Sequence, residues 1–272
     1  MKAKILTAGV VALIFIVTPF AQSAQLNFTP FLTVSEEYND NIFLTNDDEE
    51  DDFITRTTIG GTLELLGRTS GLELTYRPFY EWFDEFDEND GWSHDLSGRL
   101  WHDFTANTTM SLRNAYVRTR ESLAGRDFVA ATSDDPLVAP EIDPDQLRQG
   151  REEYYRNATT LRLDHRFGAQ DKVYASYRYD IRREVDDPPP GEDIYEYDIW
   201  SPALGLTYWF TNFWGIGADF FYENSDYKED NDQELWNGRL RLNRRITRHM
   251  DIYAQYEHTI VSFDEKTDDD VD

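Results

Sequence analysis

The chain has 272 residues, with 53 Asp or Glu against 26 Lys or Arg, a formal net charge of -27 and no cysteine. This charge excludes nucleic acid as a partner, because phosphate repels so acidic a surface, and cations are the ions expected to gather there. Without cysteine the fold has no disulfide bond, so hydrogen bonds and packing must hold it together.

The N-terminal segment predicts a secretory signal peptide. Lys2 and Lys4 precede an apolar run over residues 5–20, and small residues follow in "AQSAQ". The alternative is a membrane anchor, but about 16 apolar residues fall short of the roughly 20 that a helix needs to span a bilayer. We therefore assign residues 1–24 to the signal peptide, with cleavage near Ser23 or Ala24, and residues 25–272 to one domain.

The rest of the chain alternates in character with a period of two, which is the pattern of β-strands. In residues 157–167, for example, Leu161 and Leu163 stand on one face while Thr160 and Arg162 stand on the other. Helical spacing is nowhere sustained. The pattern predicts eleven strands, at about 25–36, 53–66, 71–83, 93–105, 108–120, 154–167, 172–183, 194–210, 213–222, 235–246 and 251–263.

The connections between these strands also alternate. Short turns follow the even-numbered strands and long polar loops follow the odd-numbered ones, as in outer-membrane β-barrels. The fold class predicted is therefore all-β, an antiparallel transmembrane up-and-down β-barrel. Because bacterial single-chain barrels have an even strand count, the odd count predicts a C-terminally truncated barrel, with about 12 or more strands when complete. A merged or split strand is the alternative.

Charged residues and aromatic residues are both distributed unevenly along the chain, with the acidic residues gathered in the loops at one end of the strands. The loop regions 36–52, 84–90, 121–153, 184–193, 223–234 and 264–272 hold 40 of the 53 acidic residues and only five of the 26 basic ones. We expect this acidic end to face the cell exterior, because charges cannot lie in hydrocarbon.

Aromatic rings near the strand ends should form two belts, one at each membrane interface. The acidic-end belt would include Tyr80, Trp82, Phe83, Trp92, Tyr154, Tyr155, Tyr195, Tyr197, Trp200 and Tyr222, and the short-turn belt Phe28, Phe104, Phe167, Tyr208, Trp209, Phe210, Phe213 and Trp214.

Residues 34–55, "VSEEYNDNIFLTNDDEEDDFIT", carry a resemblance to a known family. They resemble the N-terminal signature of the β-barrel porin group of bacterial outer-membrane proteins, some of which are encoded near exosortase and exopolysaccharide loci. The match is most specific at residues 37, 38 and 40–43 and at "DDFIT", residues 51–55. The resemblance implies an outer-membrane barrel and supplies no catalytic residues. Family members are usually longer than this chain.

The inward face of such a barrel is the predicted functional surface. Its candidate lumen-lining residues are Arg77, Arg99, Asp103, Arg162, Arg178, Asp180, Arg239 and Arg241. One hypothesis is a water-filled passage whose arginines favour anionic solutes or anionic sugar polymers. The alternative is a plugged lumen in which these charges only pair with one another, since a barrel of about 12 strands is narrow.

We therefore predict a channel or export conduit for small solutes or polysaccharide in the outer membrane of a Gram-negative bacterium. The alternatives are a structural barrel that presents acidic loops, or an outer-membrane enzyme. Enzymatic activity, a cofactor and a dedicated metal site are not expected, because neighbours such as His94 and Asp95 point to opposite faces of a strand and the acidic runs lack EF-hand spacing. The expected partners are outer-membrane lipid and lipopolysaccharide, with divalent cations at the acidic loops as a further candidate.

Overall fold

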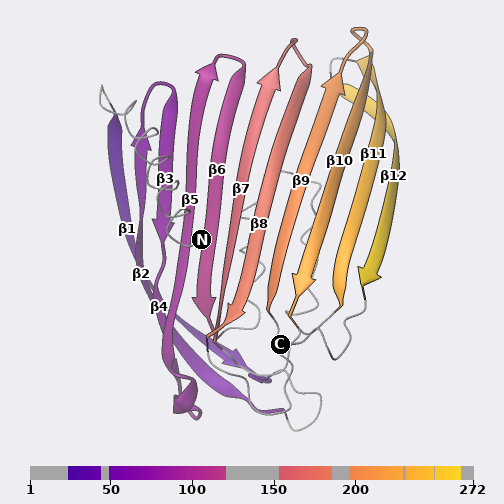
Figure 1. Cartoon of the computed structure of the whole chain (residues 1–272). Coiled ribbons are helices and arrows are strands. Elements are labelled where there is room, and N and C mark those ends of the chain that lie inside the picture. The colour runs from indigo at the N-terminus through magenta and orange to yellow at the C-terminus, as the bar shows by residue number, and fades with distance from the viewer. Residues whose placement is uncertain are drawn as a thin grey trace, which may run out of the picture.

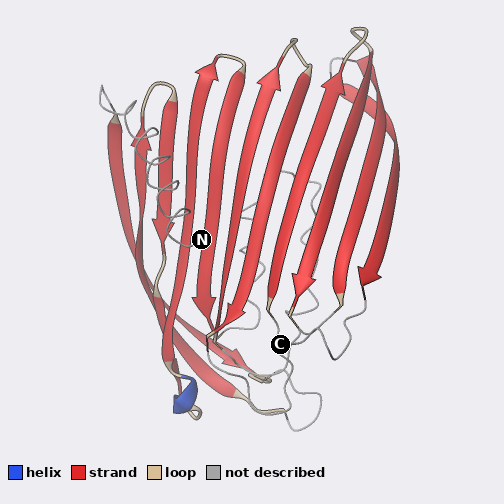
Figure 2. Cartoon of the chain, viewed as in Figure 1, coloured by secondary structure: helices blue, strands red, loops and turns tan. Residues whose placement is uncertain are grey.

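The computed structural model describes residues 24–43, 49–120, 153–185, 196–228, 231–247 and 249–264. The predicted signal peptide and much of the predicted acidic loops lie outside these residues. Within them the chain forms one 12-stranded antiparallel sheet and a short 3-10 helix, η2 (Asp87–Asn89) (Figures 1 and 2). No helix in the described ranges is long and apolar enough to cross a membrane.

The strands pair with their neighbours in chain order, which confirms the predicted all-β, up-and-down architecture. Figure 1 shows tilted strands side by side in a wall that curves from β1 to β12. The strands are β1 (Gln25–Asn39), β2 (Asp52–Leu66), β3 (Ser70–Tyr76), β4 (Phe79–Phe83), β5 (Gly91–Thr105), β6 (Thr108–Thr119), β7 (Tyr154–Arg166), β8 (Lys172–Glu184), β9 (Tyr197–Tyr208), β10 (Trp214–Tyr227), β11 (Asp232–Thr247) and β12 (Met250–Asp264).

β3 and β4 together make the single pass predicted at 71–83. Tyr76 pairs with Gly61 and Phe79 pairs with Thr58, so both pieces keep one register against β2. The strand is interrupted at Pro78, which has no N–H to donate to the ladder. The Pro78 carbonyl still accepts a hydrogen bond from the Ile59 N–H at 3.2 Å. The structure therefore contains the eleven predicted passes.

The two edges of the sheet run in the same direction. β1 and β12 both start at the end with short turns and finish at the acidic end. Among the described residues, β1 pairs with β2 alone and β12 pairs with β11 alone. The predicted C-terminal truncation remains a prediction.

The two faces of the sheet differ in exposure and in chemistry. Leu161, Leu163 and Leu242 are each 43% exposed and Leu240 is 62% exposed. This confirms that the predicted outward leucines stand on the outer wall and do not fill a globular core. On the opposite face of β7, Ala158 is fully buried. We call these two surfaces the outer face and the inner face.

Replacing Leu240 with arginine tests the outer face. A charged side chain on the lipid side of a barrel strand costs about 2–4 kcal/mol at mid-bilayer, so Leu240→Arg should lower the free energy of unfolding by that amount. Asn243→Arg, on the inner face of the same strand, is the matched control and should change it much less. Urea titration of the protein folded in lipid vesicles measures both values. Equal losses for the two variants would contradict the assignment of faces.

Candidate functional site on the inner face

The register places the eight predicted lumen residues on the inner face. Directly opposed residues of an antiparallel pair share a face, and Arg99 opposes Arg113 on β6 just as Arg162 opposes Ser111. Arg77 lies in the break between β3 and β4. The eight residues do not meet at one point, because the sheet distributes them over several strands. They form separate local clusters.

Asp180 on β8 is the centre of the most buried cluster and is itself fully buried. Arg156 on β7 donates to it twice, from Nε to Oδ1 at 3.1 Å and from Nη2 to Oδ2 at 2.8 Å. Arg178 donates from Nη2 to Oδ2 at 2.6 Å. Two guanidinium groups thus share one carboxylate, which leaves this group of three side chains with a net positive charge. Arg156 was not among the predicted site residues, although its parity on β7 matches that of Arg162.

A second cluster crosses four strands at Arg162. This side chain forms a two-pronged pair with Asp164, at 2.9 and 3.0 Å, and its guanidinium lies 3.9 Å from the ring centroid of Tyr174 on β8. The Tyr174 hydroxyl donates to Asp219 on β10 at 3.0 Å. Its ring crosses Gly205 on β9, where a Cβ atom would lie 2.1 Å from the ring. Glycine is therefore required at 205 for the tyrosine to cross the strand.

The remaining predicted residues have weaker or different partners. Arg239 donates to Glu257 at 3.4 Å, and Arg77 forms an ion pair with Asp95. Arg241 donates from Nε and Nη2 to the side-chain Oε1 of Gln255 at 3.1 and 2.9 Å, and its guanidinium lies 5.1 Å from the centroid of the Tyr253 ring. The guanidinium of Arg99 lies 5.2 Å from the centroid of the Trp101 ring. Asp103 accepts a hydrogen bond from the Thr109 hydroxyl at 2.6 Å.

Arg99 and Arg241 are two positive charges on this face that have no carboxylate partner among the described residues. Within the described residues, no ion pair joins either guanidinium to a carboxylate. Both lie instead beside aromatic rings, which attract cations without cancelling their charge. An anion passing along the inner face would therefore meet these two charges.

The segment that carries the family resemblance builds one corner of the acidic end. The Asp52 carboxylate is buried and accepts backbone N–H groups from residues 53, 84, 85 and 86 at 2.6 to 3.3 Å. Beside it, Ile42 packs with Ile54 and Phe83 in a small apolar cluster. This corner fixes the start of the β1–β2 connection against the β4–β5 connection.

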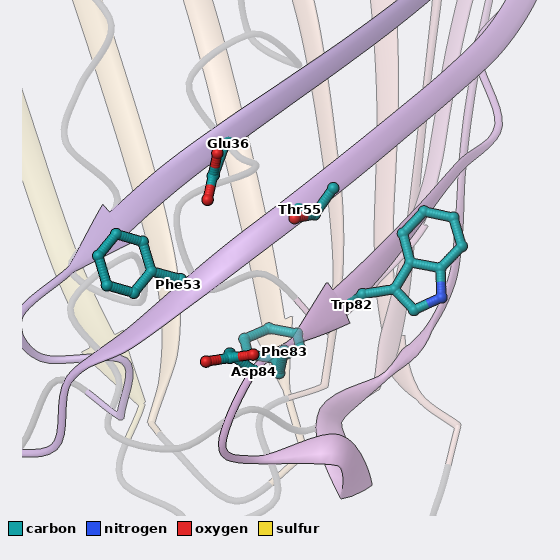
Figure 3. A pocket seen from close by; sticks show the side chains of 6 residues that line it. All are labelled: Glu36, Phe53, Thr55, Trp82, Phe83 and Asp84. Atoms are coloured by element: carbon teal, nitrogen blue, oxygen red, sulfur yellow. The ribbon is translucent and has the colours of Figure 1, made fainter.

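An open groove of about 280 Å³ lies beside this corner (Figure 3). Its lining residues are Glu36, Phe53, Thr55, Trp82, Phe83 and Asp84. Two carboxylates make the groove unsuitable for an anion. Within the described ranges, no group of three or more His, Asp or Glu is close enough to hold a metal ion.

The predicted aromatic belts need one correction. Phe83, Tyr154 and Tyr197 were expected in the acidic-end belt, but they are 5%, 6% and 2% exposed and lie on the inner face. Proximity to a strand end was the wrong criterion, because parity along the strand decides which way a ring points. Tyr154 lies 4.0 Å from the Arg182 guanidinium, and Tyr197 lies 5.8 Å from that of Arg156. Several other predicted rings are exposed, including Trp82, Trp92, Phe28, Phe104, Phe210 and Phe213. Tyr195 lies outside the described residues.

An antiparallel wall with an exposed apolar outer face and a charged inner face is the arrangement of an outer-membrane β-barrel protein. No family model matches the chain, and no curated protein matches it in sequence. Among solved structures, the chain is similar to OmpT, an outer membrane protein of Vibrio cholerae, in its trimer form, at 8% identity and a TM-score of 0.46 over 88% of this chain and 89% of that chain. The chain is also similar to a loop L8 deletion mutant of OmpT, at 8% identity and a TM-score of 0.46 over 89% of this chain and 96% of that chain. Its similarity to the toluene transporter TbuX of Ralstonia pickettii has 9% identity and a TM-score of 0.27 over 88% of this chain and 77% of that chain.

Asp180→Ala tests how strongly the inner face is held by its buried cluster. Removing the carboxylate takes the shared partner from the buried Arg156 and the partly exposed Arg178, so the free energy of unfolding should fall by about 3–5 kcal/mol. Asp95→Ala removes the partner of the half-exposed Arg77 and should cost about 1 kcal/mol or less. The measurement is denaturant unfolding of both variants in the same vesicles. Similar costs at the two sites would show that the Asp180 cluster does not brace the wall.

Proposed function

We propose that this protein is an outer-membrane β-barrel of a Gram-negative bacterium that provides a passive conduit for small anionic solutes or anionic polysaccharide. The observation that carries the proposal is the inner face, where arginines such as Arg99 and Arg241 lack carboxylate partners among the described residues although the chain has a net charge of -27. Free guanidinium groups on the inner wall favour anions by charge and by two-pronged hydrogen bonds.

The outer face supports the membrane location. Exposed leucines at mid-strand, with exposed rings such as Trp92 and Phe104 nearer the two ends, suit a band of hydrocarbon between two polar interfaces. At the acidic end, carboxylates of the β4–β5 connection face outward from the cell in this proposal. Lipopolysaccharide and the divalent cations that bridge its phosphates are the partners proposed there. The family resemblance adds exopolysaccharide as one form of the cargo.

A second candidate function is a barrel that anchors acidic loops without transport. The buried cluster of Arg156, Asp180 and Arg178 favours it, because these side chains occupy inner-face space and are paired with one another. Catalysis is not part of either proposal. Three described histidines contact hydroxyl groups, in the pairs His94–Tyr76, His102–Ser70 and His165–Thr108, and the expectation of no enzymatic activity stays a prediction.

Ion selectivity in planar lipid bilayers tests the proposed function. A charge about 10 Å from the path of an ion changes its energy in water by about 0.4 kcal/mol, or roughly twofold in population. Each lost charge should lower the chloride population and raise the potassium population by that factor, so Arg99→Gln combined with Arg241→Gln should lower the chloride-to-potassium permeability ratio by roughly 16-fold. Arg244→Gln, which removes the same charge on the outer face beside Trp214, is the control and should leave the ratio unchanged.

Two outcomes of this experiment would count against the conduit. If the folded protein gave no conductance, the anchoring function would replace it. If the double variant conducted with wild-type selectivity, Arg99 and Arg241 would not face the path of the ions.

A further inference from the structure

The groove at the acidic end of β1, β2 and β4 lies on the outer face of the sheet. Glu36 on β1 opposes Thr55 on β2, and Thr55 opposes Trp82 on β4, so the three side chains share a face. Phe53 has the same parity on β2 as Thr55 and is 50% exposed, and Trp82 is 45% exposed. The exposed Asp84 follows β4 and completes the lining of this face (Figure 3).

The register connects this face to the outer leucines. Leu65 has the parity of Phe53 and Thr55 on β2, and a series of directly opposed pairs leads from it to the exposed Leu161. The pairs are Leu65–Leu72, Leu72–Leu100, Leu100–Leu112 and Leu112–Leu161. The groove therefore opens toward the membrane side of the wall and not toward the lumen.

The two carboxylates of the groove are not neutralised by the described part of the chain. Arg56 is the only Lys or Arg of β1, β2 and β4, and it lies on the inner face, where it forms an ion pair with the buried Glu81. Within the described ranges, no ion pair reaches Glu36 or Asp84. The groove thus has a negative charge and matches a cation.

The lining favours an organic ammonium over a metal ion. Calcium takes six to eight oxygen ligands, and the described residues hold no group of three or more His, Asp or Glu that could bind a metal. A primary ammonium has three N–H donors, which suit two separate carboxylates. The faces of Phe53 and Trp82 also attract cations. Glu36 and Asp84 are the proposed acceptors.

An apolar column begins where the carboxylates end. On β1, Val34 and Leu32 follow Glu36 toward the short-turn end with the same parity, and they are 65% and 66% exposed. Ile59 on β2 opposes Leu32 and is 60% exposed. A ligand with its ammonium group in the groove can therefore lay a hydrocarbon chain along this column, which is the shape of a lipid.

The backbone on both sides of the groove is already held in place. The Asp84 N–H donates to the Phe53 carbonyl at 3.2 Å and to the buried Asp52 carboxylate at 3.1 Å. The Phe53 N–H donates to the same carboxylate at 2.6 Å. A ligand then has little backbone to order when it binds, which lowers the entropic cost of binding.

We infer that this groove binds a membrane lipid with a primary ammonium headgroup. The ammonium donates to the carboxylates of Glu36 and Asp84 beside the rings of Phe53 and Trp82, and an acyl chain lies along Val34 and Leu32. This site is separate from the inner face, so it goes beyond the proposed conduit and does not depend on it.

Native mass spectrometry of the refolded full chain in detergent micelles tests the inference, because it resolves individual bound lipids. The probes are dioctanoyl phosphatidylethanolamine, phosphatidylcholine and phosphatidylglycerol. Phosphatidylcholine has the same phosphate but no N–H donors on its ammonium, and phosphatidylglycerol has no ammonium. An exposed ion pair changes an equilibrium by up to roughly fivefold. Phosphatidylethanolamine should therefore bind roughly fivefold more tightly than either of the other lipids.

Glu36→Gln combined with Asp84→Asn should remove this preference while keeping the size of both side chains. Glu37→Gln is the matched control, because it removes the same charge from the next residue of β1, on the inner face, and should leave the preference unchanged. If the double variant does not fold, Glu36→Gln alone serves, since its exposed side chain has no ion pair within the described ranges to lose. The single variant should reduce the preference by roughly twofold or more.

Four outcomes would overturn the inference. Equal affinities for phosphatidylethanolamine and phosphatidylcholine would show that the ammonium donors are not recognised. An unchanged preference in the folded double or single variant, or an equal loss in Glu37→Gln, would show that the lipid binds elsewhere or responds only to total charge. Free ethanolamine that binds as tightly as the lipid would replace the lipid with a soluble amine.

Discussion

Hydrocarbon cannot solvate a backbone polar group or a charge. This constraint explains both the pairing of the strands and the different chemistry of the two faces of the sheet. Every N–H and C=O in the spanning region must find a partner within the protein, which a continuous antiparallel ladder provides for the strands that lie between β1 and β12. Every charged side chain must turn away from lipid, which a period of two allows. The exposed Leu240 and its inward neighbour Arg241 show both demands met by adjacent residues of one strand.

The inner face then has to accommodate the charges that the outer face excludes. It does so in two ways that have different consequences. Near Asp180 the charges are buried and shared, so that carboxylate and guanidinium groups hold β7 and β8 together. At Arg99 and Arg241 the positive charge rests beside aromatic rings and stays available to an anion. In the proposed conduit, the same residue type therefore serves stability near Asp180 and anion recognition at Arg99 and Arg241.

Much of this arrangement was predictable from single-strand patterns. Alternation located the strands, and parity placed Arg162 and Leu161 on opposite faces because both properties depend only on neighbours along the chain. The stack of Arg162, Tyr174 and Gly205 was not predictable, since it depends on the register between three strands. Parity along β7 could have identified Arg156, but its burial depends on β8 and β9. The belt positions of Tyr154 and Tyr197 were wrong because depth along a strand does not determine the face.

In an outer-membrane barrel, one face of the sheet meets lipid and the other meets water. The chain has no cysteine, so single cysteines placed in turn at residues 173–181 of β8 can carry nitroxide labels in the vesicle-embedded protein. Accessibility to oxygen, which concentrates in lipid, should peak at the odd positions such as Tyr177, and accessibility to a water-soluble nickel chelate should peak at the even positions such as Ser176. Profiles without a period of two, or with the two phases exchanged, would contradict the account.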